Sequence, residues 1–282
     1  MRPAFEEALT RSLPRDASGA PALARAITDA ALSPGKRLRP LVALAAGALV
    51  RAQEPAAMAV AVAIELVHAA SLVLDDLPSM DDARRRRGRP AIHVTYGVAT
   101  AELAAVALLC RAFETAGSAP GLPAAARARV VAELAAAAGA EGCCSGQAAD
   151  LGADPAHLTL EDLEAIHARK TGALFVAAVR GGAIAGGARE PALEALTRFA
   201  RNLGLAFQIT DDLLDLEGDA GEMGKDTLRD GHRANFATLV GAPSSRRLVD
   251  DLLESAVSAL QRFGARGATL GDLARVVRDR RS

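Results

Sequence analysis

The chain has 282 residues, of which 50% are hydrophobic and 24% are charged, so its composition is that of a globular protein rather than a disordered or fibrous one. Its 33 basic residues balance 34 acidic ones, which argues against a nucleic-acid-binding surface. Only Lys36, Lys170 and Lys225 are lysines, and all the other basic residues are arginines. In a chain that uses arginine almost everywhere, we expect the few lysines to mark special sites.

The cysteines and the apolar runs indicate where the protein works. Cys110 and the adjacent pair Cys143 and Cys144 offer neither metal-ligand spacing nor a disulfide framework, and an odd count is typical of a reducing cytoplasm. We expect all three to be small buried hydrophobic residues. Residues 1–15 are charged throughout, unlike a signal peptide, and the longest apolar runs are shorter than the roughly 20 residues of a membrane span. The sequence predicts a soluble cytoplasmic protein without a membrane span.

Helical patterns dominate the chain. Ala and Leu fill long segments, β-branched alternation is scarce, and Gly and Pro fall between segments, so we expect an all-α protein with a single domain over residues 1–282. Thr159 followed by Asp162 is typical of an N-terminal capping box. The candidate helices span residues 21–32, 41–52, 55–76, 100–116, 124–149, 160–185, 190–216 (open to a break near Gly204) and 244–263.

The first acidic cluster, DDLPSMDD at residues 75–82, closes an apolar helix. Pro78 should end that helix, so that Asp81 and Asp82 fold back beside the first two aspartates. Carboxylates crowded at the end of an apolar helix repel one another and are costly to desolvate. Such a cluster makes sense if it binds a hard cation that prefers oxygen ligands, usually Mg²⁺.

The second acidic cluster, QITDDLLD at residues 208–215, lies within a helix. Asp211 and Asp215 are four residues apart and Gln208 comes three before Asp211, so these side chains share one face. Either cluster alone could be a solvated acidic surface. Two clusters, each on an apolar helix and each accompanied by basic residues, favour facing Mg²⁺ sites and a polyanionic substrate, most simply a diphosphate.

Basic residues accompany the aspartates. Lys36 and Arg39, in the motif GKRLRP, lie three apart at the start of a helix, where the helix dipole attracts anions. The four arginines at 84–87 could form a solvated patch, but beside the first cluster we expect at least two of them to recognise phosphate. His68, two turns before Asp75, is either a satisfied core histidine or a phosphate donor.

Two other reaction classes lack their motifs. No glycine-rich loop ends in GK[ST], which disfavours nucleotide triphosphate chemistry. No Ser/His/Asp or Cys/His arrangement is legible, which disfavours nucleophilic hydrolysis.

A series of motifs in order carries a family resemblance. They are GKRLRP (35–40), ELVHAASLVLDDLPSMDD (65–82), RRGRPAIHVTYG (86–97), GQAADL (146–151), HARKTGALF (167–175), GLAFQITDDLLD (204–215) and GK (224–225). Together they resemble the trans-polyprenyl diphosphate synthases over nearly the whole chain. The DDxxxxD spacing of the first cluster is similar to that of the bacterial short-chain enzymes, particularly geranylgeranyl diphosphate synthases.

The resemblance implies a helical bundle around a central apolar cavity, where isopentenyl diphosphate condenses head to tail with dimethylallyl, geranyl or farnesyl diphosphate. It also implies three Mg²⁺ ions, a homodimer, and no protein base, because the departing diphosphate removes the final proton. The roles it implies are Asp75, Asp81 and Asp211 as metal ligands supported by Asp76, Asp212 and Asp215; Arg86, Lys170 and Lys225 on the allylic diphosphate; Lys36, Arg39, His68 and Arg87 on isopentenyl diphosphate; Thr171 and Gln208 toward the allylic cation; and Phe207 near the homoallylic substrate.

Product length should depend on the floor beneath the first cluster. Ala70, with Ser71 beside it, stands five residues before Asp75, about 7.5 Å deeper along the helix. The resemblance implies that bacterial farnesyl diphosphate synthases tend to carry an aromatic residue there. Small residues predict the twenty-carbon product, geranylgeranyl diphosphate, unless Phe113 or another residue sets the floor, and farnesyl diphosphate is the alternative.

Three departures from the family pattern leave the metal ligands intact. Leu74 stands where the family often has His, and Val106 where an Asp is common. A second Lys often follows the GK motif, but here the stretch reads His232-Arg233, so Arg233 is a candidate substitute.

Two alternatives come from other classes of protein. A non-catalytic subunit that modulates a partner synthase would be expected to lose aspartates from one cluster, and both clusters are intact. A terpene cyclase would need only the allylic site, whereas GKRLRP and Arg87 favour a second diphosphate.

Overall fold

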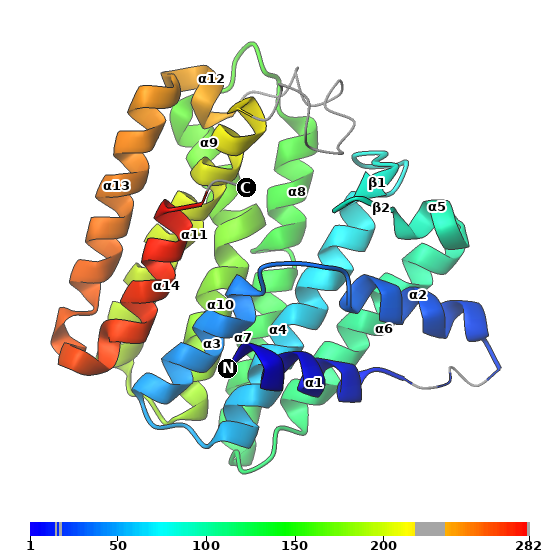
Figure 1. Cartoon of the computed structure of the whole chain (residues 1–282), viewed down its shortest axis with the longest axis horizontal. Coiled ribbons are helices and arrows are strands. Elements are labelled where there is room, and N and C mark those ends of the chain that lie inside the picture. The colour runs from blue at the N-terminus through cyan, green and yellow to red at the C-terminus, as the bar shows by residue number, and fades with distance from the viewer. Residues whose placement is uncertain (15, 17–18, 218–234, 281–282) are drawn as a thin grey trace.

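The computed structural model describes residues 1–14, 16, 19–217 and 235–280. Nearly all regular structure in these ranges is helical, apart from an antiparallel hairpin of β1 (Arg85–Arg86) and β2 (Arg89–Pro90). The all-α bundle that we predicted is therefore confirmed (Figure 1).

The helices follow one another in chain order with mostly short connections. They are α1 (Arg2–Ser12), α2 (Pro21–Ala31), α3 (Leu38–Leu49), α4 (Glu54–Asp75), α5 (Ile92–Tyr96), α6 (Val98–Gly117), α7 (Ala124–Ala138), α8 (Cys143–Gly152), α9 (Leu160–His167), the π-helical turn η1 (Ala168–Gly172), α10 (Ala173–Ala185), α11 (Glu190–Glu217), α12 (Phe236–Val240), α13 (Ala242–Ala259), the 3₁₀ segment η4 (Gln261–Gly267) and α14 (Ala268–Arg278).

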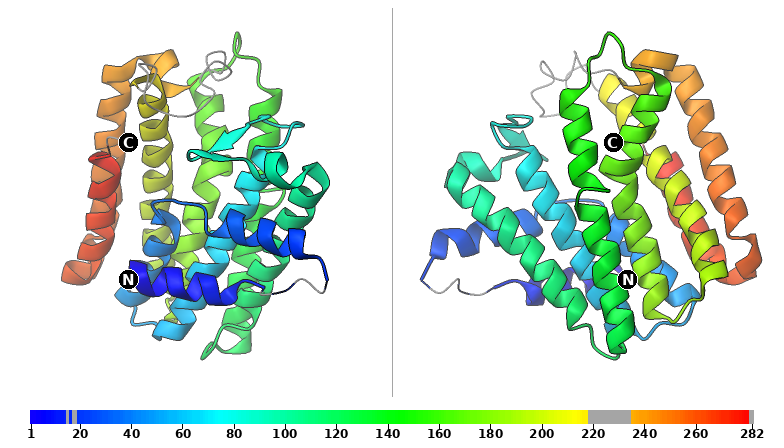
Figure 2. Two further views of the ribbon diagram at one scale, coloured as in Figure 1. Left: turned by 45° about the vertical axis from the view of Figure 1, so that its right-hand side comes forward. Right: turned by 180° about the vertical axis from the view of Figure 1, so that it is seen from behind.

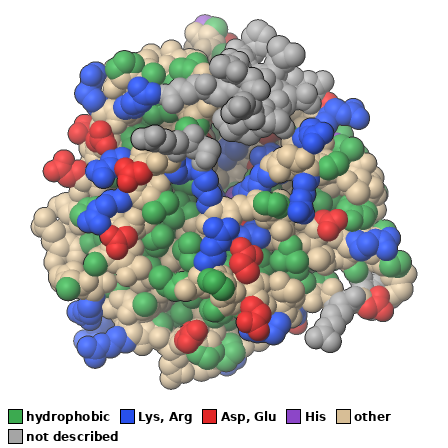
Figure 3. Space-filling view, viewed as in Figure 1, with side chains coloured by type: hydrophobic (Ala, Val, Ile, Leu, Met, Phe, Trp, Pro, Cys, Tyr) green, Lys and Arg blue, Asp and Glu red, His purple; other side chains and the backbone are tan. Residues whose placement is uncertain are grey.

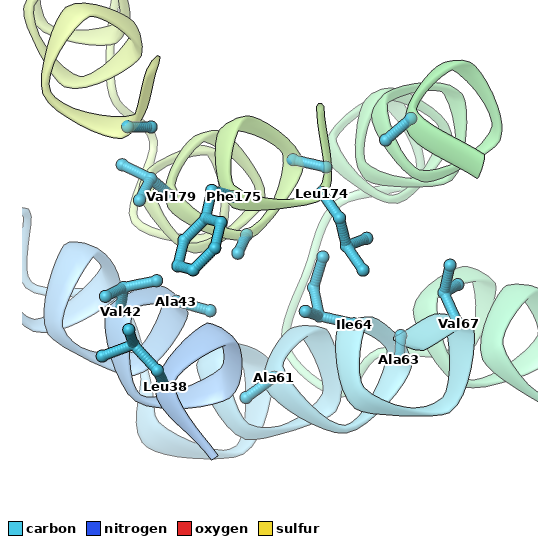
Figure 4. Close-up of a cluster of buried hydrophobic side chains, with 14 of the residues drawn as sticks. Leu38, Val42, Ala43, Ala61, Ala63, Ile64, Val67, Leu174, Phe175 and Val179 are labelled. Atoms are coloured by element: carbon cyan, nitrogen blue, oxygen red, sulfur yellow. The ribbon is translucent and has the colours of Figure 1, made fainter. Parts of the chain in front are cut away.

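The centre of the bundle is formed by α3, α4 and α10, whose side chains interlock as Figure 4 shows. Val42, Ile64 and Phe175 are all fully buried there. Helix α11 packs beside α10 and is covered by α13 and α14, while α6 packs along the other side of α4 (Figure 2). Helices α1 and α2 lie across α4 and α6 (Figure 1). Because the central helices are apolar on several faces, burial against these neighbours stabilises the fold.

The helix predicted over 124–149 is in fact two helices. α7 ends at Ala138, and α8 begins at Cys143. Gly139 adopts an extended conformation, and a Cβ on Gly142 would lie 2.1 Å from the carbonyl oxygen of Ala137. The prediction was wrong because the alanine-rich sequence carries the same helical pattern across the break.

The break considered near Gly204 does not occur, since α11 runs unbroken through it. A Cβ on Gly204 would lie 3.0 Å from the Cα of Gly172 and 3.4 Å from Phe175. This glycine therefore permits two helices to approach closely. The predicted 160–185 segment is continuous, with the predicted capping box of Thr159 and Asp162 at its start and η1 in its middle.

The sequence patterns missed the short or weakly apolar elements α1, α5, α12, α14 and the β1–β2 hairpin. Helix α1 fully buries only Phe5 and Leu9, which are four residues apart, and apart from the half-buried Ala8 the rest of it is polar or exposed. One buried stripe of two side chains is too weak a signal to distinguish from a loop.

Helix α4 is long and apolar enough to cross a membrane by length and composition alone, contrary to our expectation for the apolar runs. In the structure, 67% of its apolar window is buried inside the bundle. Core helices of globular bundles have this character, so α4 is weak support for a membrane span.

The cysteine prediction was correct for bonding and wrong for burial. All three cysteines are free, but Cys110 on α6 and Cys144 on α8 are exposed. Cys143 is half-buried, and burial raises the pKa of its thiol to about 11. Cys110 lies outside the core because it follows Val106, itself 56% exposed, on the outer face of α6.

We expect Gly182→Ala to destabilise the fold by about 1–3 kcal/mol, as overpacking of a core does. A Cβ at this position of α10 would lie 2.1 Å from the carbonyl oxygen of Ala43 on α3. Gly271 in α14 has open space around its Cβ position, so Gly271→Ala should be neutral or stabilise the helix by up to about 1 kcal/mol. Urea unfolding of both variants measures the difference, and equal stabilities would contradict this account of the α3–α10 contact.

Candidate active site

The first aspartate cluster forms a tight turn after α4. The helix ends at Asp75, and the backbone N–H of Asp81 donates to the carbonyl oxygen of Asp75 at 3.0 Å. Asp82, with φ of 47°, donates its N–H to Leu77 at 3.0 Å. The chain therefore folds back beside Asp75, as the position of Pro78 predicted.

The β1–β2 hairpin directs two arginines toward different parts of the site. Arg86 Nε donates to Asp76 Oδ1 at 2.9 Å, and its Nη2 contacts the same oxygen. Arg87 Nη1 instead donates to the carbonyl oxygen of Pro34, at 2.6 Å, in the loop before α3. The preceding Arg84 and Arg85 are exposed. The hairpin thus connects the first cluster with the GKRLRP segment.

Charge compensation at Asp75 is incomplete. Burial raises the pKa of its carboxyl to about 6, the nearby Lys170 ammonium opposes that rise, and the carboxylate of Asp81 adds to it. A carboxylate that burial disfavours in its charged form gains most from a further cation.

The π-helical turn η1 joins the two aspartate clusters. Lys170 forms an ion pair with Asp150 of α8 at 2.6 Å, and its ammonium is also the opposing charge that lowers the pKa of Asp75 most. The adjacent Thr171 donates its hydroxyl hydrogen to Gln208 Oε1 at 2.8 Å, on the side of the second cluster. Adjacent side chains of this turn are therefore directed to different sides, Lys170 toward Asp150 and Thr171 toward Gln208.

A glycine lets this turn approach α8. A Cβ on Gly146 would lie 2.2 Å from the backbone nitrogen of Lys170 and 2.6 Å from its Cα. The neighbouring Gln147 is buried and directs its amide nitrogen toward Met80 Sδ, 4.0 Å away in the turn of the first cluster. The GQ pair of the motif GQAADL therefore contacts both η1 and the first cluster.

In the second cluster, Asp212 is buried and well supplied with donors. Gln208 Nε2 donates to its Oδ1 at 3.0 Å, and the backbone N–H of Phe236 donates to its Oδ2 at 3.1 Å. Burial nevertheless raises the pKa of Asp212 to about 6, and the nearby carboxylates of Asp211 and Asp215 contribute to the rise. These two hydrogen bonds therefore do not fully compensate the buried negative charge of Asp212.

Asp211 is paired with an arginine from the end of the chain. Arg280 Nη2 lies 2.6 Å from Asp211 Oδ1, and the Arg280 guanidinium stacks 4.5 Å above the Phe207 ring. The Arg280 side chain is only 11% exposed, and its Nε and Nη1 are buried without a hydrogen-bond partner among the described residues. The Arg280 guanidinium is thus paired with the Asp211 carboxylate, which we predicted to be a metal ligand.

The cations of the GKRLRP segment face these groups. Arg39 lies 4.7 Å from the centroid of the Phe175 ring and 5.5 Å from that of Phe207, and its Nη1 is 3.4 Å from His68 Nε2. Burial and the surrounding arginines hold the pKa of His68 well below its usual value, so this histidine is neutral. Lys36 is close enough for Arg280 and Asp211 to perturb its pKa, which burial lowers. Figure 3 shows lysine and arginine side chains gathered around a hollow on this face.

The donor chemistry of the two clusters fits a hard divalent cation. The ligands are carboxylate oxygens, and burial raises the pKa values of Asp75 and Asp212. Within the described ranges, no three His, Cys, Asp or Glu side chains are already close enough to hold a metal ion. The aspartates are held instead by Arg86, Arg280 and backbone donors, so a metal would replace internal ion pairs.

The structure brings most of the predicted site residues to one end of the bundle. Asp215 is exposed near the end of α11, Ala70 is fully buried in α4, and Ser71 donates its hydroxyl hydrogen to the carbonyl oxygen of His68 at 2.9 Å. Leu74 is half-buried. Lys225 and His232-Arg233 lie outside the described residues.

Sequence reasoning missed three residues of the site. Asp150 and Gln147 both lie within the GQAADL motif, so the motif was a signal even though neither residue was assigned a role. Arg280 had no such signal, because it is one of several arginines at residues 275–281 and reaches Asp211 through the packing of α14 against α11.

Comparisons with known proteins identify the family of the chain. A model of the polyprenyl synthetase family matches residues 20–254. The farnesyl diphosphate synthase of Escherichia coli (strain K12) is 42% identical over 238 residues, covering 83% of this chain and 80% of that protein. The chloroplastic geranylgeranyl pyrophosphate synthase 11 of Arabidopsis thaliana is 42% identical over 245 residues, covering 84% of this chain and 69% of that protein.

The fold also matches solved structures. The crystal structure of an FPP/GFPP synthase from Zymomonas mobilis, in its apo form, superposes with a TM-score of 0.88 at 33% sequence identity. The match covers 98% of this chain and 95% of that one.

We expect Arg280→Ala to strengthen Mg²⁺ binding by roughly threefold to tenfold, because a metal ion would no longer compete with a charge-assisted contact for Asp211. A Mg²⁺ titration followed by the thermal unfolding temperature, without substrate, measures this change. Arg278→Ala is the matched control, since Arg278 is 51% exposed and pairs with Asp279. Equal or weaker Mg²⁺ binding by Arg280→Ala than by the control would contradict the competition.

Proposed function

The chain belongs to the polyprenyl synthetase family and is a prenyltransferase, and we propose that its product is geranylgeranyl diphosphate. Synthases of this family use isopentenyl diphosphate and allylic diphosphates and are generally Mg²⁺-dependent. One observation carries the proposal for the site: the Lys170 ammonium, paired with Asp150, is close enough to lower the pKa of Asp75, while the adjacent Thr171 donates a hydrogen bond to Gln208 of the second cluster. Both clusters therefore surround a single reaction centre.

In this proposal the aspartates hold the metal and the nearby cations hold the allylic diphosphate. Asp75, Asp81 and Asp211 would be the principal ligands of three Mg²⁺ ions, with Asp76, Asp212 and Asp215 in support. The ions would neutralise the leaving diphosphate as Lewis acids. Arg86 and Lys170, released from Asp76 and Asp150, would then donate to its oxygens, together with Lys225.

The second diphosphate would bind at the GKRLRP segment. Lys36, Arg39 and Arg87 supply positive charge beside the neutral His68, which can donate one ring N–H. Phe207 lies beneath two guanidiniums, those of Arg39 and Arg280, and offers an apolar surface for the homoallylic carbon chain. A second cationic site of this kind favours condensation over cyclisation of one diphosphate.

Between the two diphosphates, the oxygens of Thr171 and Gln208 are fixed before any substrate binds. Their mutual hydrogen bond and that of Gln208 to Asp212 hold both side chains in place. Such preorganised dipoles stabilise an allylic cation without reorganising during the reaction. The departing diphosphate would remove the final proton, so the proposal requires no protein base.

The proposed product rests on the small residues below the first cluster. The relatives include both farnesyl and geranylgeranyl diphosphate synthases, so their names do not choose between fifteen and twenty carbons. Ala70 lies about 1.4 turns below Asp75 on α4, and a methyl group there leaves more room for a growing chain than an aromatic ring would. We also propose a homodimer in the cytoplasm. A purely regulatory subunit is disfavoured, because the chain keeps every aspartate of both clusters.

The proposed function is tested by incubating the purified protein with Mg²⁺, isopentenyl diphosphate and each of the three allylic primers. Mass spectrometry of the products should show a twenty-carbon diphosphate as the longest major species. A fifteen-carbon end product would support the farnesyl alternative, and no elongation from any primer would exclude synthase activity.

We expect Ala70→Phe to shorten the product toward fifteen carbons, because the phenyl ring would fill the space below Asp75. Product length is read by the same mass spectrometry, with the thermal unfolding temperature as a check that the core accepts the ring. Phe113→Ala on α6 tests the alternative, in which Phe113 rather than Ala70 limits the length of the product. If Ala70 sets the floor, Phe113→Ala leaves the product unchanged, whereas a longer product from Phe113→Ala would place the floor at Phe113.

A further inference from the structure

The loop that carries Lys36 is held in an unusual backbone conformation. Arg37, which directly precedes α3, has φ of 54° and ψ of 31°, the left-handed region that non-glycine residues rarely adopt. Its carbonyl oxygen accepts the first hydrogen bond of α3, from Leu41 at 3.1 Å. Lys36 and Arg39 flank Arg37, so its conformation sets how these two cations are directed.

Arg37 keeps this conformation because its side chain is locked beneath the loop. Arg37 Nη1 lies 2.5 Å from Glu65 Oε1 of α4, and both side chains are only 4% exposed. Its Nε donates to Glu6 Oε1 of α1 at 3.0 Å. Two carboxylates from different helices therefore hold one buried guanidinium, which compensates for its burial and for the strained backbone.

Helix α1 contacts the same loop at a second point. Arg2 Nη2 donates to the carbonyl oxygen of Gly35 at 2.8 Å, directly before Lys36. The helix itself is fixed by Phe5 and Leu9, which are fully buried against the core. Residues 2 and 6 project from this anchored helix toward the loop, one contacting its backbone and the other its buried arginine.

From these contacts we propose that Glu6 is a positioning residue for the homoallylic diphosphate, acting through Arg37 to hold Lys36 and Arg39 in their binding orientation. The inference rests on the proposed function, because it assumes that these two cations bind isopentenyl diphosphate. It assigns a role to α1, which lies wholly before residue 20, where the match to the family begins.

The test is a comparison of Glu6→Ala with Glu7→Ala. Glu7 is the adjacent residue on α1, but its side chain is 71% exposed and pairs with Arg11 on the outer face. Glu6→Ala should raise the KM for isopentenyl diphosphate about threefold to tenfold, the range for partial loss of a charge-assisted hydrogen bond. The KM for the allylic primer and kcat should stay unchanged, and Glu7→Ala should resemble the parent protein in all three.

Arg2→Ala, with Arg11→Ala as its control, provides a second measurement of the same group of contacts, because Arg2 Nε also lies 3.8 Å from Glu6 Oε1. Arg2 is 55% exposed, so its loss should not prevent folding, and its KM effect should have the same direction as that of Glu6→Ala. Glu6→Gln keeps the hydrogen-bond acceptor without the charge and should give an intermediate KM.

Lys36→Ala separates failure of this inference from failure of the proposed function. If Lys36→Ala leaves the KM for isopentenyl diphosphate unchanged, the proposed role of this loop is wrong, whatever Glu6 does. If Lys36→Ala raises that KM and Glu6→Ala does not, the positioning role of Glu6 is overturned. Equal increases of both KM values with a lower thermal unfolding temperature in Glu6→Ala would also overturn it, because a general loss of structure would then explain the effect.

Discussion

The site depends on carboxylates that are buried at one end of an apolar bundle and on cations that the chain itself supplies to them. Asp76 is paired with Arg86, Asp211 with Arg280, and Asp150 with Lys170. Removing such charges from water is costly, and a hydrogen-bonded partner offsets much of that cost. The fold therefore tolerates the aspartates without a metal ion because each of these carboxylates has a guanidinium or ammonium group in contact.

These ion pairs also suit a site that is proposed to take up both metal ions and diphosphates. Under the proposed function, a bound metal diphosphate brings cations for the carboxylates and an anion for the released basic groups. The net charge of the enclosed site then changes little. Binding would therefore add little to the free-energy cost of keeping charged groups away from water, which the folded chain already bears. Burial raises the pKa values of Asp75 and Asp212 to about 6, so both carboxylates would gain from a nearby metal ion.

The sequence predicted the parts of this arrangement that are local in the chain. The turn at residues 75–82 follows from a proline after an apolar helix, and the capping box at Thr159 follows from two residues three apart. Long apolar helices such as α4 were placed to within one residue at each end. In contrast, Gly204 suggested a break, although its role is to permit close packing against Gly172. A glycine alone does not reveal whether a chain bends there or packs closely.

The rest could not be predicted because it depends on contacts between distant residues. The pairing of Asp211 with Arg280 joins positions 69 residues apart in number but adjacent in space, and no spacing rule indicates it. The π turn is equally hidden, since its sequence HARKTG is compatible with an ordinary helix. In this turn Lys170 acts on the charge of Asp75 while Thr171 bonds to Gln208, and Gly146 admits the backbone of Lys170 close to α8.

Both ends of the chain reach the site from outside the segment that matches the family. Helix α1 contacts the GKRLRP loop through Glu6 and Arg2, and the residues after α14 place Arg280 against Asp211. Neither end supplies an aspartate of the two clusters. The N-terminal helix contacts the loop that carries the cations of the proposed homoallylic site, and Arg280 contacts Asp211, a proposed metal ligand. Under the proposed function, the segment over 20–254 carries the reactive groups, and contacts from the flanking segments help to hold some of them. Related synthases could therefore share every aspartate and still differ in substrate affinity or metal requirement through changes at their ends.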